Sequence, residues 1–148
     1  MAGAVTIAVR HMTHEDACAV AMLTTQLGYP ATEDEIRSRY DLIMERRDSC
    51  LFVAQGGELI VGWIHVQAMY LLECGARAEI WGLVVSETAR GTGVGRRLVH
   101  AAEQWALGRG LGMMALRSNQ LRTDARGFYE HLGYKVTKTQ NAFRKNLT

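Results

Sequence analysis

The residues of this chain best suited to chemistry form a glycine-rich loop between two apolar segments. Residues 90 to 96 read Arg-Gly-Thr-Gly-Val-Gly-Arg, after the run Ile80–Val85 and before a helix expected from about Gly93 to Leu107. Glycines permit positive φ angles and let an anion approach bare N–H groups. A helix N-terminus adds unpaired donors and the positive end of its dipole. The spacing therefore predicts a backbone cradle for a phosphate group.

Two common phosphate-binding patterns do not fit this loop. A dinucleotide fingerprint, G-x-G-x-x-G, requires a third glycine where the chain has Arg96 or Leu98. A mononucleotide P-loop requires a Gly-Lys-Ser/Thr ending, which the loop lacks. The residues therefore exclude both the dinucleotide fingerprint and the P-loop, although the physical argument for a phosphate cradle stands.

The composition is that of an ordinary globular protein. The chain has 148 residues, of which 48% are hydrophobic and 22% charged, and its net charge is +2. Its 17 Lys and Arg residues are spread along the chain, a distribution that does not favour nucleic-acid binding. Neither a signal pattern nor an apolar run of membrane length is found, so we expect a soluble, cytoplasmic protein without a membrane partner.

The cysteines and histidines do not form a metal-binding pattern. Cys18, Cys50 and Cys74 are widely spaced and include no C-x-x-C pair, which argues against a disulfide scaffold or structural zinc and suits a reducing cytosol. The histidines show no grouped spacing either, so we expect no metal site. Cys74 lies in an expected loop, where a lone thiol is usually incidental.

The elements that must position the loop alternate in the second half of the chain. Strands are expected at Val5–Arg10, Cys50–Ala54, Glu58–Tyr70, Ala78–Ser86, Met113–Arg117, Tyr134–Thr137 and Ala142–Asn146. Four helices are expected. The first runs from Thr13 or His14 to about Leu27, and the second begins after a capping box of Thr32 and Glu35. The third runs from about Gly93 to Leu107, and the fourth covers Thr123–Leu132. This order predicts one α/β (α+β) domain over residues 1–148, with a mixed sheet and helices on both faces.

Three segments together resemble the GNAT-type N-acetyltransferases. Arg90, Gly93 and Gly95 meet the acyl-CoA signature Arg/Gln-x-x-Gly-x-Gly of that family. Residues 83–85, Leu-Val-Val, resemble its fourth strand, and residues 128–134, Phe-Tyr-Glu-His-Leu-Gly-Tyr, resemble the end of its last helix. The resemblance implies a GNAT-like acyl-CoA N-acyltransferase fold of about seven strands, splayed between strands 4 and 5 to admit the pantetheine arm.

The resemblance also implies where acetyl-CoA binds. Strand amides at Leu83 and Val85 would bind the pantetheine and acetyl group, and loop amides would bind the pyrophosphate. Arg90, Arg96 and Arg97 would add charge, and Arg97 is alternatively part of a solvated helix face. The cofactor-binding residues expected in this way are Leu83, Val84, Val85, Arg90, Gly91, Thr92, Gly93, Val94, Gly95, Arg96 and Asn119. Asn119 is alternatively a plain loop residue, because Arg122 occupies the position nearer the helix that the family more often uses.

Transfer of an acetyl group to an amine requires two proton movements. The ammonium, with a pKa of ~10, must lose a proton before the amine can attack, and the departing thiolate benefits from gaining one. The resemblance assigns the acid role to Tyr129, which is alternatively a core tyrosine beside Phe128. Glu79 is the first candidate base, eleven positions before Arg90, as in histone-type members of the family.

The assignment of the base leaves alternatives. An alternating strand would place Glu79 on one face with Trp81, Leu83 and Val85, where the indole could raise the pKa of the carboxyl. Glu79 is alternatively a solvent-facing residue at a strand end. His65 on the central strand, or ordered water, is the other candidate base.

The function expected is acetyl transfer from acetyl-CoA to a primary amine, directly in a ternary complex. The acceptor is a small molecule such as an aminoglycoside, polyamine or amino acid, or a peptide amine. Its binding wall is expected from residues 25–45, the strand near Trp63 and the loop Tyr70–Arg77; residues 33–35, Glu-Asp-Glu, either attract a cationic amine or simply begin a helix. The alternative is a non-catalytic module that senses acyl-CoA or another ligand. The resemblance also makes a homodimer plausible.

Overall fold

The structure of the chain, a computed structural model, describes residues 6–120 and 123–148. These form two compact units, one ending at Leu116 and the other beginning at Arg117. Val5, the first residue of the first expected strand, lies outside the described residues. None of the described helices is long and apolar enough to cross a membrane.

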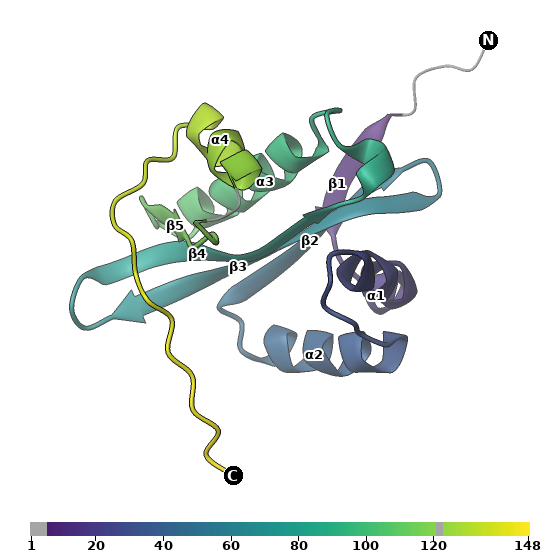
Figure 1. Ribbon diagram of the computed structural model, residues 1–148. Coiled ribbons are helices and arrows are strands. Elements are labelled where there is room, and N and C mark those ends of the chain that lie inside the picture. Colours follow the sequence, from purple (N-terminus) through teal and green to yellow (C-terminus); the bar gives the residue numbers. More distant parts are fainter. Residues whose placement is uncertain (1–5, 121–122) are drawn as a thin grey trace. The chain divides into compact units, whose positions relative to one another are not determined.

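The first unit is a five-stranded mixed sheet with helices on both faces (Figure 1). Its strands are β1 (Ile7–His11), β2 (Ser49–Gly56), β3 (Leu59–Leu71), β4 (Gly75–Val85) and β5 (Met114–Leu116). Its helices are η1 (His14–Asp16), α1 (Ala17–Gln26), α2 (Glu33–Glu45), η2 (Glu87–Ala89) and α3 (Val94–Gly108). The strand order is β1-β2-β3-β4-β5, antiparallel up to β4 and parallel between β4 and β5. The parallel pair follows because α3 returns the chain before β5 begins.

Strand β4 contains a β-bulge at Trp81. The register pairs Val66 with Ile80 and the preceding residue, His65, with Gly82, so Trp81 is the extra residue of β4. Its side chain is 49% exposed. A single inserted residue reverses the alternation of every side chain that follows it in the strand.

The bulge corrects one expectation about this strand. Residues directly opposite each other in a ladder share a face of the sheet. Glu79 is opposite Gln67 and Leu83 is opposite Ile64, and positions 64 and 67 of β3 point to opposite faces. The prediction that Glu79 shares one face with Trp81, Leu83 and Val85 is therefore wrong for Leu83 and Val85, because strict alternation does not survive the bulge.

One face of the sheet packs against α3. Its buried side chains are Ile64, Val66 and Ala68 of β3, with Val94, Leu98, Val99, Ala102 and Ala106 of α3. A Cβ atom at Gly62 would lie 2.9 Å from the Val84 carbonyl oxygen and 3.0 Å from Leu98 Cδ1. Glycine at position 62 therefore allows the first turns of α3 to approach the sheet closely.

The other face packs against α1 and α2. Its buried cluster consists of Met12, Ala17, Val20, Ala21, Ile36, Leu51 and Val53. Trp63 packs against this cluster while partly exposed, and a Cβ atom at Gly82 would lie 2.8 Å from two carbons of its indole ring. The indole therefore rests on the bare backbone of Gly82. Trp63, His65, Gln67, Glu79 and Gly82 all lie on this face by register.

Two helix starts on this side of the unit are capped by side chains. Thr32 Oγ1 accepts from the Glu35 N–H and Glu35 Oε1 accepts from the Thr32 N–H, both at 3.1 Å, which confirms the expected capping box. Asp16 accepts two hydrogen bonds of 2.8 Å from the Arg10 guanidinium and one of 2.8 Å from the Thr13 N–H. These bonds, with that from Arg10 the largest cause, lower the pKa of Asp16.

Strands β4 and β5 pair over a short distance only. Their ladder runs from Ala78 opposite Met114 to Ile80 opposite Leu116, whereas β4 continues to Val85. All three residues of β5 are paired, so the ladder ends where β5 ends, and the splay expected between the fourth and fifth strands stays a prediction. The short ladder leaves the second half of β4 paired through its β3 edge.

The second unit contains α4 (Thr123–His131), ended by Gly133 at φ +94°. The strands expected at Tyr134–Thr137 and Ala142–Asn146 are not formed: residues 134–148 lie outside any strand, and Val136 and Phe143 are 57% and 92% exposed. β-Propensity alone does not make a strand, because the gain comes from pairing and from burial of one face. The described residues thus contain five strands where about seven were expected, and the α/β class is confirmed.

Candidate active site

The glycine-rich loop connects η2 to α3 as the sequence predicts. Gly91 and Gly93 have φ angles of +79° and +86°, and Gly93 is the N-cap of α3. Only glycine adopts this region without strain, so the two residues are required by backbone conformation. The Thr92 hydroxyl donates to the Ala89 carbonyl and closes the turn. The loop therefore has the left-handed geometry that a phosphate cradle needs.

The first turn of α3 carries positive charge. It contains Arg96 and Arg97 and no acidic residue, although the positive end of a helix dipole disfavours cations. The first turn of α2, by contrast, is acidic. Arg96 and the preceding Arg90 are exposed, whereas Arg97 donates to the Ile7 carbonyl of β1 and thus ties α3 to the edge of the sheet. Two exposed guanidinium groups and the N–H groups of the turn surround one helix start.

The backbone of β4 beyond the bulge presents N–H groups at two edges. The Ser86 N–H donates to the Val61 carbonyl, and successive N–H groups along a strand alternate between its edges. The Val84 N–H is therefore directed toward β3, and those of Leu83 and Val85 toward the edge where pairing with β5 has ended. These are the two amides that sequence reasoning selected for the pantetheine.

Glu79 is buried, with 3% of its surface exposed, on the α1/α2 face. Arg77, two residues earlier on the same face, places Nη2 3.7 Å from Glu79 Oε1. The alternative that Glu79 is a solvent-facing strand end is wrong. Trp81, the aromatic residue expected beside it, is the unpaired residue of the bulge and is 49% exposed. Trp63 provides a further indole on the face of Glu79.

His65 lies on the same face as Glu79, opposite Gly82. Burial lowers its pKa, a shift that the nearby charge of Asp48 opposes, so the imidazole is neutral at physiological pH. Its Nε2 is buried and has no hydrogen-bond partner among the described residues. A neutral imidazole beside a buried carboxylate has the right chemistry to accept or orient a proton.

Tyr129 lies in α4 of the second unit. Its ring packs edge-on against Phe128 and Tyr134, with centroids 5.0 and 5.7 Å apart. Burial raises the pKa of its phenol to about 12, so the hydroxyl keeps its proton at neutral pH. The aromatic packing expected of a structural tyrosine and the protonation state required of an acid are both present.

The remaining expected residues lie in exposed positions. Asn119 is exposed in the segment after β5. Arg122 lies outside the described residues. Glu33 and Glu35 form ion pairs with Arg37 (2.5 Å) and Arg39 (3.3 Å), which favours the interpretation of an ordinary acidic helix start. Cys18, Cys50 and Cys74 are free, and no group of three metal-ligating side chains occurs in the part of the chain that the structure describes.

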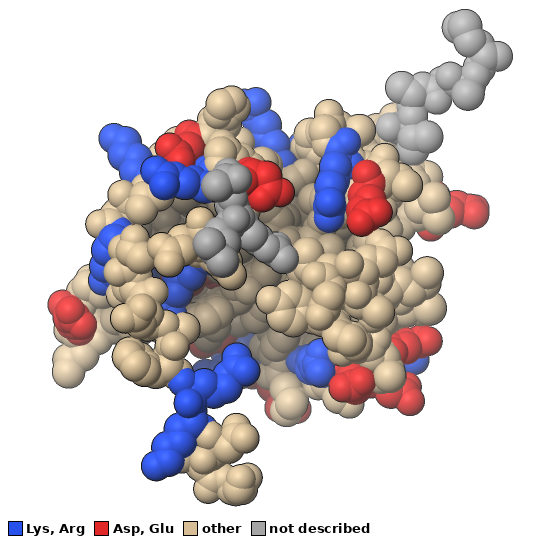
Figure 2. All heavy atoms as spheres, viewed as in Figure 1, with Lys and Arg blue, Asp and Glu red and all other residues tan. Residues whose placement is uncertain are grey.

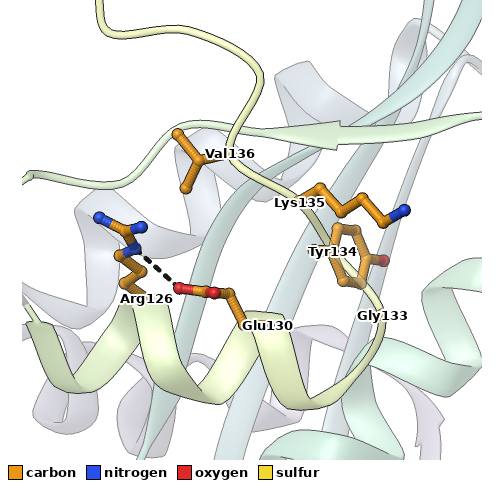
Figure 3. Close-up of a pocket in the computed structure, with 6 residues that line it drawn as sticks. All are labelled: Arg126, Glu130, Gly133, Tyr134, Lys135 and Val136. Atoms are coloured by element: carbon orange, nitrogen blue, oxygen red, sulfur yellow. Dashed lines mark hydrogen bonds and ion pairs between the residues drawn. The ribbon is translucent and has the colours of Figure 1, made fainter.

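The second unit has a shallow pocket that sequence reasoning did not find. It is lined by Arg126, Glu130, Gly133, Tyr134, Lys135 and Val136 (Figure 3). Arg126 Nε and Glu130 Oε1, one helical turn apart, form an ion pair of 2.7 Å across its floor. The paired charges make it a poor phosphate site compared with the loop before α3.

The fold and the loop together have the features that the motifs predict for an acyltransferase of this type: a mixed sheet, a bulged fourth strand that extends beyond the fifth, and a glycine-lined helix start. The model of the acetyltransferase (GNAT) family matches residues 10–134. The chain therefore belongs to this family of acyl-transferring enzymes.

Two curated proteins are similar in sequence. Human N-acetyltransferase 8B is 32% identical over 92 residues, which are 60% of this chain and 40% of that protein. Rice (Oryza sativa subsp. japonica) glucosamine 6-phosphate N-acetyltransferase 1 is 29% identical over 116 residues, 75% of this chain and 68% of that protein. The match thus spans less than half of the human protein and about two thirds of the rice one.

Solved structures match over nearly the whole chain. A transcriptional regulator from Bacillus halodurans C-125 superposes with a TM-score of 0.85 at 27% identity, covering 95% of this chain and all of the other. An aminoglycoside N-acetyltransferase in complex with CoA superposes with a TM-score of 0.86 at 19% identity, covering 98% of each chain. At that identity, the second match establishes the fold.

Proposed function

We propose that this chain transfers the acetyl group of acetyl-CoA to a primary amine of a small molecule, directly within a ternary complex. The observation that carries the proposal is the continuous donor surface of the first unit. The amides of Leu83 and Val85 face the edge where β5 pairing ends, and the chain then leads into the left-handed loop and the basic start of α3.

In this proposal the pyrophosphate binds the loop and the pantetheine binds β4. The N–H groups of residues 91–96, from Gly91 through Thr92, Val94 and Gly95, hold the phosphate oxygens, with Arg90 and Arg96 adding charge. The amides of Leu83 and Val85 hold the pantetheine and the acetyl carbonyl. Asn119 is proposed as a further contact to the cofactor. We also propose one domain over residues 1–148, because the family match extends from position 10 to position 134.

Glu79 and Tyr129 are proposed to move the protons. Glu79 takes a proton from the acceptor ammonium, directly or through water, and the freed amine nitrogen attacks the thioester carbonyl carbon. The carbon–sulfur bond then breaks, and the Tyr129 hydroxyl gives its proton to the departing thiolate. The nitrogen of the new amide loses its surplus proton, which restores the Tyr129 phenol directly or through water. The buried position of Glu79 supports the first role, and the protonated state of the Tyr129 phenol at neutral pH is the one that a proton donor requires.

The acceptor is proposed to be a small-molecule amine, since the similar proteins include enzymes named for glucosamine 6-phosphate and for aminoglycosides. A cytoplasmic location is proposed because the three cysteines are free. A homodimer stays a prediction.

The test measures acetyl-CoA binding and turnover separately. Acetyl-CoA at ~100 times its Kd should stabilise the protein by about 2.7 kcal/mol, and free thiol should be released when an amine panel is added. Arg96→Gln should weaken acetyl-CoA binding by roughly tenfold or more, because a charge-assisted bond to phosphate is lost. Arg39→Gln, on the exposed surface of α2, is the matched control. An unchanged melting temperature with saturating acetyl-CoA contradicts the proposal.

A second function is a non-catalytic module that senses acyl-CoA or another ligand. It is favoured by the match to a structure named as a transcriptional regulator. Acetyl-CoA would then stabilise the protein, but no amine in the panel would accelerate thiol release. Turnover with any acceptor amine would favour the enzyme over the non-catalytic module.

A further inference from the structure

The α1/α2 face of β3 and β4 carries polar atoms that the fold itself does not satisfy. Within the described residues, three buried side-chain nitrogens have no hydrogen-bond partner: Trp63 Nε1, His65 Nε2 and Arg77 Nε. Trp63 and His65 are alternate residues of β3, and Arg77 lies on β4 opposite Met69. By register all three belong to the same face.

Buried nitrogens without a partner are unusual in a protein interior. An unsatisfied buried polar group costs free energy, and the great majority of buried donors and acceptors in folded proteins are paired. Three unsatisfied nitrogens on one face of two adjacent strands therefore indicate that this face takes hydrogen-bond partners from outside the fold, from water or from a polar ligand.

The charges on this face have a definite order along β4. Arg77 comes first and Glu79 follows two residues later, while His65 on β3 is neutral and lies near Glu79 in the ladder. The side chain of Arg77 is 25% exposed, so a ligand reaches it from solvent although Nε is buried. Its partners are weak: Glu79 Oε1 at 3.7 Å and Cys74 Sγ at 3.8 Å.

A guanidinium with long contacts and an unused Nε is suited to a further anion. Its five N–H donors match a carboxylate or phosphate in a two-point interaction. Asp48, an acidic group near His65, is already engaged by the Ser49 hydroxyl (3.3 Å) and by Arg46 (3.9 Å). The face thus offers one accessible cation beside one buried carboxylate.

We propose that the acceptor amine also carries an acidic group, which binds Arg77 while the amine lies beside Glu79 and His65. This inference rests on the proposed function. Arg77 Nη2 lies 3.7 Å from Glu79 Oε1, so the acidic group and the amine of the acceptor bind to neighbouring side chains. Arg77 selects against polycationic acceptors such as aminoglycosides and polyamines, because their additional ammonium groups meet a like charge.

The experiment measures thiol release with matched acceptors that differ in the acidic group alone. One pair is an amino sugar and its phosphate; the other is an amino acid and its amide. We expect the acidic member of one pair to have at least a tenfold higher kcat/KM, mainly through a lower KM. The pair that shows the preference separates a phosphate site from a carboxylate site.

Substitution of Arg77 tests whether this residue causes the preference for an acidic acceptor. Arg77→Gln should bring the ratio of kcat/KM within the preferred pair close to one, and Arg77→Lys should retain part of it, because lysine keeps the charge without the planar fork. Arg144→Gln, at an exposed arginine of the segment after α4, is the control and should leave the ratio unchanged. An equal or greater kcat/KM for the neutral or polycationic acceptors, or an unchanged ratio in Arg77→Gln, overturns the inference.

Failure of the inference about Arg77 can be distinguished from failure of the proposed function. Stabilisation by acetyl-CoA and turnover with any amine test the enzyme, whereas the ratio within a pair tests Arg77. If Arg77→Gln does not fold, the wild-type ratio and the partial ratio of Arg77→Lys still decide. A wild-type ratio near one in both pairs refutes the acidic-acceptor class outright.

Discussion

Replacement of Gly93 by alanine separates backbone conformation from steric contact in the loop before α3. A Cβ atom at this position meets nothing within 4 Å, so alanine is accommodated in space. The φ angle of +86° is the only obstacle. Holding a residue with a Cβ atom in the left-handed region costs about 1–2 kcal/mol. The variant should unfold at a lower denaturant concentration by that free energy.

Gly108→Ala is the matched control at the other end of the same helix. Position 108 is equally open, with no atom within 4 Å, but its φ is not positive. Alanine there should stabilise the helix by roughly 0.5–1 kcal/mol, because glycine has more backbone freedom to lose. The two substitutions therefore have opposite signs although the chemical change is identical.

Equilibrium unfolding in urea, with and without acetyl-CoA, measures both effects. About 1 kcal/mol corresponds to ~2–4 °C in melting temperature for a chain of this size, so a thermal scan resolves the pair as well. Gly93→Ala should also reduce stabilisation by acetyl-CoA, because relaxation out of the left-handed region turns the loop N–H groups. A Gly93→Ala protein as stable as the wild type would refute the conformational argument.

Three further predictions follow from single contacts. Tyr129→Phe should lower kcat by about 10²–10⁴-fold while acetyl-CoA still stabilises the protein; unchanged turnover would make Tyr129 structural. Gly82→Ala should destabilise the protein by about 1–3 kcal/mol, because its Cβ would displace the Trp63 indole 2.8 Å away; unaltered Trp fluorescence and stability would contradict this. The pKa of Asp16 is lowered in the folded state, so its contribution is present above the unfolded pKa near 3.8 and lost as pH falls through the lower folded value. Asp16→Asn should therefore reduce stability at pH 7 by about 1–3 kcal/mol and flatten the acid limb of a stability–pH curve.

The distribution of charge shows where sequence reasoning reached its limit. Figure 2 shows basic and acidic side chains interspersed over the visible face, as expected from the spread of Lys and Arg along the chain. For Arg97, however, the sequence leaves open a phosphate contact or a solvated helix face, whereas in the structure Arg97 donates to the Ile7 carbonyl of β1. Spacing within one element does not reveal a partner 90 residues away in the sequence.

The tail shows a related limit. Apolar and β-prone residues at Tyr134–Thr137 and Ala142–Asn146 satisfied a local pattern for strands, yet no ladder forms there among the described residues. Strand stability depends on a partner and a buried face, which a local pattern cannot supply.

The sequence by itself determined the glycine loop, the capping box at Thr32, the alternation of strands and helices, and the family. Each depends on local chemistry: the φ freedom of glycine, the reach of a threonine hydroxyl, and the periodicity of apolar residues. Only the tertiary structure decided which residues face each other. The bulge at Trp81 reversed the faces of β4, directed the amides of Leu83 and Val85 to the open edge, and left Glu79 with His65 and Arg77. A single extra residue in one strand is visible only against its partner strand, and for that reason it lay beyond the sequence.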